Sequence, residues 1–83
     1  MRKPRILIAD DDTMVRIGLK TVINWEENGF VLVGEAANGL EAMQLVQEKK
    51  PDIVITDIKM PGMDGISLAR RIRQDDKEVL LMF

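Results

Sequence analysis

The sequence predicts one α/β domain built on a parallel sheet, because short apolar runs alternate along it with segments of helical period. A length of 83 residues allows one domain at most. Hydrophobic residues make up 46% and charged residues 31%, which is typical of a globular protein rather than a disordered one. Repeated strand–helix–strand order implies right-handed crossovers, with helices on both faces of the sheet.

Four short apolar runs are expected to form strands, of which the first and the third are typical of strands buried on both faces. They span residues 5–9, 30–35, 53–56 and 79–83. Three segments of helical spacing lie between them, at residues 13–23, 40–49 and 65–73. Candidate helix caps stand before each segment, namely Asp12 or Thr13, Asn38 and Asp64. Pro51 stops the second helix, and a turn is expected at residues 75–77.

The apolar stripe of each helix is expected to face the core. The three stripes comprise Val15, Leu19, Val22 and Ile23, widened by Met14 and Ile17; then Leu40, Met43 and Val46; then Ile66, Leu68, Ala69 and Ile72. Trp25, the only tryptophan, is expected to pack over a helix end.

The missing residue types exclude several classes of function. The chain has no cysteine and no histidine, which excludes disulfides, thiol nucleophiles, Ser-His hydrolases and metal sites built from thiolate or imidazole. A net charge of −2 predicts no general attraction to nucleic acid or anionic lipid. No apolar run approaches the roughly 18 residues of a membrane span. The apolar run after Arg5 is also too short for a secretory signal, so we expect an intracellular protein.

Two of the expected strands end in aspartate, the first at Asp10, Asp11 and Asp12 and the third at Asp57. If these strands are neighbours, the carboxylates converge at the edge where parallel sheets bind ligands. Negative charges so close repel one another unless a cation lies among them. Oxygen ligands suit Mg²⁺, Mn²⁺ or Ca²⁺, and Mg²⁺ fits best. A lone aspartate in such a place is usually a cap or turn residue, but two strand ends favour a site.

The loop after Asp57 supports a site, because Pro61, Gly62 and Gly65 form turns that can face backbone carbonyls inward.

Residues 6–12 (ILIADDD) and 52–65 (DIVITDIKMPGMDG) together resemble the receiver domain of bacterial two-component response regulators. The connection 24–30 (NWEENGF) resembles the subgroup whose receivers precede an AraC-type helix-turn-helix output domain. The resemblance implies a flavodoxin-like sheet with strand order 2-1-3-4.

The resemblance also implies a role for four residues. Asp57 is the phosphoacceptor, whose carboxylate attacks the phosphorus of a phospho-histidine on a partner sensor histidine kinase. Mg²⁺ (or Mn²⁺) is bound by Asp11 directly and by Asp10 largely through water, beside the Asp57 carboxylate and the backbone carbonyl of Lys59. The resulting acyl phosphate is a timed switch for a transcriptional output domain, so the chain is not expected to be a turnover enzyme. We expect a cytoplasmic location, no membrane association and no direct binding of nucleic acid.

The chain departs from the family pattern at its C-terminal end. Family members have five strands and five helices, whereas residues 1–83 are expected to form one incomplete receiver domain without the final strand, the last two helices or a second domain. Phe83 falls where a phosphate-contacting hydroxyl is usual, and no residue can be assigned to the phosphate-contacting lysine. The apolar edge at residues 79–83 predicts self-association by strand pairing or segment exchange.

Two other functions remain open at this point. A phosphatase of the haloacid-dehalogenase type also uses a strand-end aspartate and Mg²⁺, but Met14 occupies the last position of its Asp-x-Asp-x-Thr/Val signature. The other alternative is a receiver-like module that binds partners without being phosphorylated. Turnover of a phosphate ester would indicate the phosphatase, and the absence of any phosphate adduct would indicate the interaction module.

Overall fold

The computed structural model alternates strands and helices in the expected order, and it describes residues 3–60, 63–75 and 80–82. Within these residues the elements are β1 (Arg5–Ala9), α1 (Thr13–Val22), β2 (Val31–Ala36), α2 (Gly39–Lys49), β3 (Ile53–Thr56), α3 (Gly65–Asp75) and β4 (Leu80–Met82). Asp75 belongs to α3, so this helix is longer than the sequence pattern predicts. The expected features at Pro61, Gly62, Asp76, Lys77, Val79 and Phe83 lie outside the described residues.

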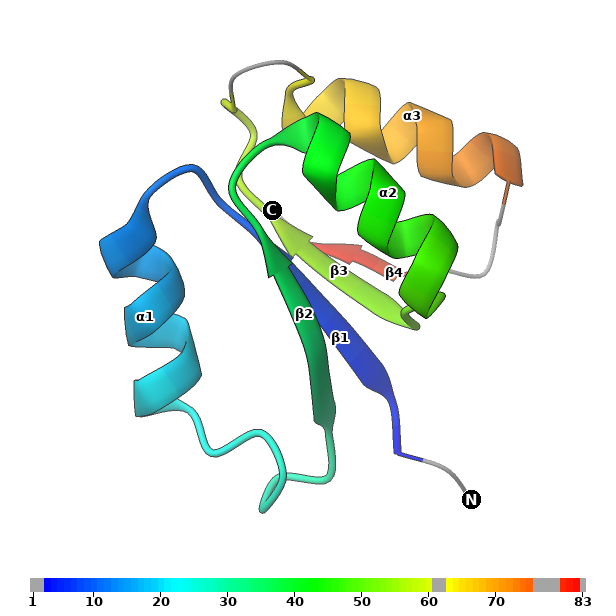
Figure 1. Cartoon of the computed structure of the whole chain (residues 1–83). Coiled ribbons are helices and arrows are strands. Elements are labelled where there is room, and N and C mark those ends of the chain that lie inside the picture. The colour runs from blue at the N-terminus through cyan, green and yellow to red at the C-terminus, as the bar shows by residue number, and fades with distance from the viewer. Residues whose placement is uncertain (1–2, 61–62, 76–79, 83) are drawn as a thin grey trace.

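The strands form one parallel sheet in the order β2-β1-β3-β4, which confirms the predicted topology (Figure 1). The β1 and β3 strands are therefore neighbours, as the expected convergence of carboxylates requires. Their register pairs Ile6 with Ile53 and Ala9 with Thr56. The two strands thus end at the same level of the sheet.

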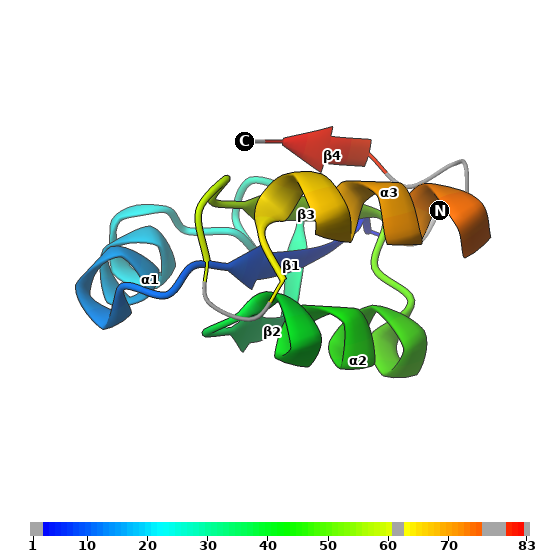
Figure 2. The ribbon, with the colours of Figure 1, turned by 90° about the horizontal axis from the view of Figure 1, so that it is seen from above.

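The helices divide between the two faces of the sheet. The β1-α1-β2 connection moves toward one edge, whereas the two later connections move toward the other, so right-handed crossovers place α1 opposite α2 and α3. Figures 1 and 2 show α2 and α3 side by side and α1 apart from them. The α2 helix packs against β1, β2 and α3.

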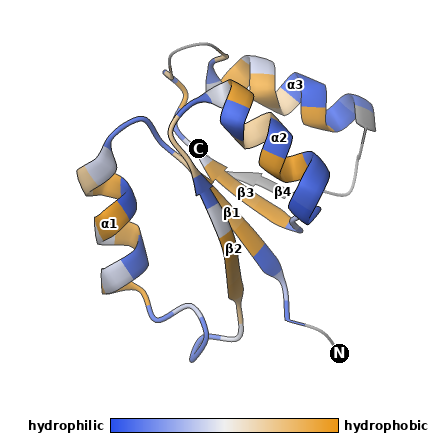
Figure 3. Ribbon diagram, in the orientation of Figure 1, coloured by the Kyte–Doolittle hydropathy of each residue, from blue (hydrophilic) through white to orange (hydrophobic). Residues whose placement is uncertain are grey.

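The core lies between the sheet and the α2–α3 layer. Its fully buried side chains include Leu7 and Val54 from the sheet and Leu68 and Ile72 from α3. All of β1 beyond Arg5 is buried, which confirms a strand covered on both faces. Figure 3 shows the apolar residues that run along β1 and β3.

The apolar stripe of α1 is not part of the core, contrary to the prediction. The helix has no buried residue, and Val22 is 83% exposed. The physical reason is that α1 lies alone on its face, since the other described helices cover the opposite one. The stripe of α2 is also corrected at Leu40, which is 63% exposed, while Ala42, Met43 and Val46 form the buried side.

The expected N-cap and C-terminal end of α2 are confirmed, although the helix begins one residue earlier than expected, at Gly39. Asn38 Oδ1 accepts a hydrogen bond from the Glu41 backbone N–H at 2.8 Å, so it is the N-cap. Lys50 closes the helix in the left-handed region, with φ at 48°, directly before Pro51. Among the described residues, no helix combines the length and the apolar character that crossing a bilayer would need.

Candidate metal site at the carboxyl edge of the sheet

The sheet ladder continues past the ends of β1 and β3 and thereby fixes the backbone of two aspartates. The Asp57 N–H donates to the Ala9 carbonyl at 3.0 Å, and the Asp10 N–H donates to the Ala36 carbonyl at 3.0 Å. Both residues therefore leave the sheet from hydrogen-bonded positions on adjacent strands. A site built on strand ends is held more rigidly than one built on a free loop.

Three carboxylates meet at this edge, as the sequence predicts. One oxygen each from Asp10, Asp11 and Asp57 lie within 4.8 Å of one another. Asp10 is half-buried, whereas Asp11 and Asp57 are exposed. Two ligands on opposite sides of a Mg²⁺ ion are about 4.2 Å apart, given bond lengths near 2.1 Å. Small side-chain rotations would therefore close these oxygens on one ion, and an all-oxygen donor set is what Mg²⁺ and Mn²⁺ prefer.

The third aspartate of the run has a different task. Asp12 Oδ1 accepts from the backbone N–H groups of Met14 at 2.9 Å and Val15 at 3.4 Å, so Asp12 is the N-cap of α1. Its own N–H donates to Asp10 Oδ1 at 2.9 Å. This turn within the aspartate run orients the Asp10 carboxylate.

The loop after β3 folds back against the site. Gly65 donates its backbone N–H to the Ile58 carbonyl at 2.7 Å, and a Cβ on Gly65 would overlap the Asp57 carbonyl oxygen. Lys59 is exposed and lines an open depression together with Asp11, Met60 and Asp64. The structure therefore brings Lys59 next to the carboxylate cluster.

Asp64 begins α3 as expected. Its Oδ1 accepts from the Ser67 backbone N–H at 2.8 Å. This hydrogen bond is the main cause that holds the pKa of Asp64 below its ordinary value of 3.8. Asp64 thus stays charged where the positive end of the helix dipole favours an anion.

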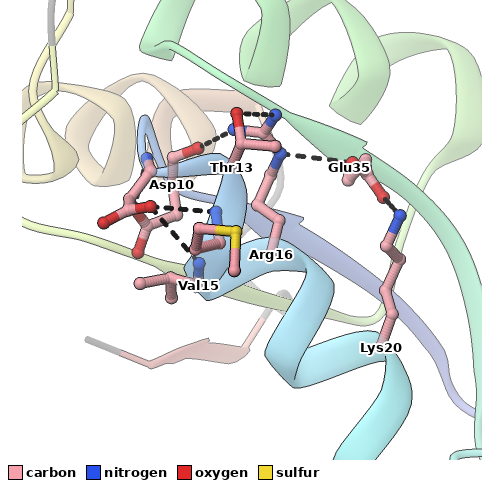
Figure 4. Close-up of polar contacts among 8 residues, drawn as sticks. Asp10, Thr13, Val15, Arg16, Lys20 and Glu35 are labelled. Atoms are coloured by element: carbon pink, nitrogen blue, oxygen red, sulfur yellow. Dashed lines mark hydrogen bonds and ion pairs between the residues drawn. The ribbon is translucent and has the colours of Figure 1, made fainter.

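Sequence reasoning missed three charged residues beside the cluster. Arg16 and Lys20 of α1 both contact the Glu35 carboxylate of β2, and Arg16 also contacts the Asp10 carbonyl (Figure 4). Glu35 pairs in register with Ile8. A charged residue inside an otherwise apolar strand is the signal that could have predicted a partner there.

The family model of the response regulator receiver domain matches residues 6–83. The chain belongs to this family. Receiver domains are signalling domains of two-component systems, so the resemblance seen in the sequence is confirmed.

Two of the similar proteins are transcriptional regulators by name, and a third belongs to a CheX-CheY complex. The "Uncharacterized transcriptional regulatory protein YesN" of Bacillus subtilis is 47% identical over 68 residues, which cover 82% of this chain and 18% of YesN. A solved two component transcriptional regulator AraC from Clostridium phytofermentans is 36% identical with a TM-score of 0.86; the match covers 94% of this chain and 63% of that one. The CheX-CheY-BeF3-Mg+2 complex from Borrelia burgdorferi gives 33% identity and a TM-score of 0.83 over 93% of this chain and 57% of that one.

The chain thus spans less than two thirds of each of these proteins. The similarity to the AraC regulator agrees with the subgroup suggested by residues 24–30.

Proposed function

We propose that this receiver domain accepts a phosphoryl group on Asp57 from a sensor histidine kinase. The observation that carries the proposal is the meeting of Asp57 with Asp10 and Asp11 across neighbouring strands. Asp57 is exposed, so a phospho-histidine on another protein can reach its carboxylate. Its backbone is held by the hydrogen bond to Ala9, which fixes the position of the nucleophile.

The oxygen cluster fits a divalent cation, Mg²⁺ or Mn²⁺. Asp10, Asp11 and Asp57 would hold it through their carboxylates, and Lys59 through its backbone carbonyl. The complex from Borrelia burgdorferi, whose name includes BeF3 and Mg+2, supports this choice of cation by similarity. When bound, such a cation neutralises negative charge on the oxygens of a transferring phosphoryl group.

The chemistry assigned to this chain is nucleophilic attack by a carboxylate. An Asp57 oxygen forms a bond to phosphorus while the bond between phosphorus and the imidazole nitrogen of the kinase breaks, and that nitrogen keeps the electron pair. The product is an acyl phosphate with more negative charge than the aspartate it replaces. Such a product can act as a switch because it is labile.

We assign the output to transcription, through an AraC-type domain that is not among these 83 residues, with the receiver acting in the cytoplasm. The name of YesN, which describes a transcriptional regulatory protein, and the similarity to the AraC regulator support this assignment. The net charge of −2 gives the chain itself no electrostatic attraction to DNA.

A small phosphoryl donor tests the function without the kinase. Incubation with phosphoramidate and Mg²⁺ should add one labile phosphate, seen by intact-mass spectrometry, and chelation of the metal should prevent it. Asp57→Asn should abolish the adduct because an amide is a poor nucleophile. Asp64→Asn should keep the adduct, although Asp64 lines the depression that also contains Asp11 and Lys59. Repeated turnover of a phosphate ester would instead support a phosphatase, and no adduct on the unmodified chain would support an interaction module.

A further inference from the structure

Arg16 joins the helix, the metal site and the neighbouring strand through one side chain. Its guanidinium donates from Nη1 to the Asp10 carbonyl oxygen at 2.6 Å, from Nε to Glu35 Oε1 at 3.2 Å, and from Nη2 to Thr13 Oγ1 at 3.3 Å. The Arg16 side chain is only 13% exposed, although it belongs to a helix that has no buried residue. Figure 4 shows the three groups converging on it.

From this geometry we propose that Arg16, anchored by Glu35, is a positioning residue for the carboxylate cluster. It holds the peptide between Asp10 and Asp11 in the orientation that points both side chains at the site. The proposal rests on the proposed function in one respect, because it assumes that the carboxylate cluster binds a divalent cation.

The hydrogen bond from Arg16 to the Asp10 carbonyl oxygen acts on the backbone between two of the clustered aspartates. The Asp10 carbonyl belongs to the planar peptide unit that links Asp10 to Asp11. A hydrogen bond that fixes the direction of this carbonyl therefore fixes the orientation of the peptide plane. The Cα atoms of Asp10 and Asp11 both lie in that plane, so the bond also positions both side chains. The bond is charge-assisted and, at 2.6 Å, shorter than the 3.0 Å ladder bond from the Asp10 N–H to Ala36.

Arginine suits this position because its guanidinium is a rigid fork. One edge reaches the Asp10 carbonyl while another nitrogen is held by Glu35 on β2. A lysine is a single point of charge on a flexible stem and cannot hold both acceptors in a fixed relation. Lys20 contacts the other Glu35 oxygen, Oε2, at 2.5 Å.

Packing does little to hold α1, which makes the polar contact more important. The apolar side chains of Met14, Val15, Ile17 and Val22 are between 41% and 83% exposed. The helix that follows the aspartate run is therefore joined to β2 mainly by the polar contacts of Arg16 and Lys20 with Glu35. Loosening the Arg16 contact should let the run move relative to Asp57.

Binding of Mn²⁺ alone, measured from the electron paramagnetic resonance signal of the free ion, tests the proposal on the 83-residue chain. Arg16→Gln should raise the dissociation constant roughly tenfold, the low end of the effect of lost outer-shell partners. The loss of a positive charge near the site would by itself strengthen the binding of Mn²⁺. Weaker binding in Arg16→Gln therefore cannot be a simple charge effect. Arg16→Lys, which keeps the charge but loses the fork, should fall between Arg16→Gln and the unmodified chain.

Lys20→Gln is the matched control, because it removes the same charge from the same helix and also breaks a contact to Glu35. Its Mn²⁺ affinity should stay within about twofold of the unmodified chain, since it leaves Arg16 on the Asp10 carbonyl. Circular dichroism checks that each variant is folded. If Arg16→Gln is unfolded, the Mn²⁺ affinity of Arg16→Lys tests the proposal in its place.

Two results would overturn the proposal: unchanged affinity in folded Arg16→Gln or Arg16→Lys, or an equal loss in Lys20→Gln. If the unmodified chain itself binds no Mn²⁺, the cation site of the proposed function fails instead, so the two failures are distinguishable.

Discussion

Gly65 approaches the Asp57 backbone so closely that no side chain fits between them. A Cβ there would overlap the Asp57 carbonyl oxygen and come within 3.0 Å of the Ile58 Cα. Both neighbours are backbone atoms, which cannot rotate away as a flexible side chain can. The glycine thus lets α3 begin directly against the residue that we propose as phosphoacceptor.

Gly65→Ala should lower the free energy of unfolding by about 1–3 kcal/mol, the usual effect of forcing extra volume into a packed site. It should also slow phosphorylation by phosphoramidate, because the backbone of Asp57 must shift. Urea unfolding followed by Trp25 fluorescence measures the first effect.

Gly18→Ala is the control: Gly18 lies within α1 with nothing within 4 Å of its Cβ position, so alanine should stabilise by about 0.5–1 kcal/mol. If the two substitutions changed the free energy of unfolding equally, the close contact of Gly65 with the Asp57 backbone would be contradicted.

The residues of the cluster could be predicted because their positions follow from topology. Asp10 and Asp57 each follow a recognisable strand, and parallel neighbours end at one edge of a sheet. Arg16 and Glu35 could not be predicted in the same way. Their contact depends on how α1 lies across β2, and no periodic pattern in the sequence reports the angle between a helix and a strand.

At the scale of elements, α1 differs from the other helices in how it is held. The α2 and α3 helices bury apolar side chains against the sheet or each other, whereas α1 contacts β2 through Arg16, Lys20 and Glu35. Trp25 adds a hydrogen bond from Nε1 to the Leu19 carbonyl at 3.1 Å, which confirms the expectation that it packs over a helix end. The helical period predicted that α1 exists, but amphipathicity alone could not show whether its stripe is covered.

The attachment of α1 should depend on pH through Glu35. The hydrogen bond from Lys20 is the largest cause that holds the pKa of Glu35 below its ordinary value of 4.5; burial acts in the opposite direction, and Arg16 adds to the lowering. A carboxyl whose pKa is lower in the folded state stabilises the fold above the unfolded pKa. That stabilisation is lost as the pH falls from 4.5 through the lower folded value.

Glu35→Gln should therefore flatten the fall in unfolding free energy below about pH 4.5, while the two curves run parallel near neutrality. Urea unfolding at a series of pH values measures both curves. High salt should shrink the difference, because these side chains are partly exposed and ions screen them. Identical acid slopes at low salt would show that the contact adds no pH-dependent stability.

At the scale of the whole molecule, much apolar surface is left open within the described residues. The α1 side of the sheet is covered by one loosely packed helix, and β4 pairs with β3 on one side only. An unpaired strand edge offers free N–H and C=O groups to another chain. The order of the sheet was predictable from the alternation of elements, whereas the degree of cover on each face was not, because it depends on packing angles.

The 83-residue chain should self-associate through the β4 edge or by segment exchange. Light scattering should give a mean mass above that of the monomer, rising over a range of about 1 to 100 µM. Val22→Lys, which alters an exposed position of α1, should leave the association intact because strand pairing uses backbone groups. A compact monomer over the whole range would contradict the expectation, and loss of association in Val22→Lys would move the interface to α1.

The location of the phosphate after labelling with phosphoramidate and Mg²⁺ tests the proposed phosphoacceptor most directly. Borohydride converts an aspartyl phosphate into homoserine, and tandem mass spectrometry of the digested chain identifies the converted position. Homoserine at residue 57 alone is the predicted result. Conversion at Asp10 or Asp11 instead, or at no aspartate, would contradict the role proposed for Asp57.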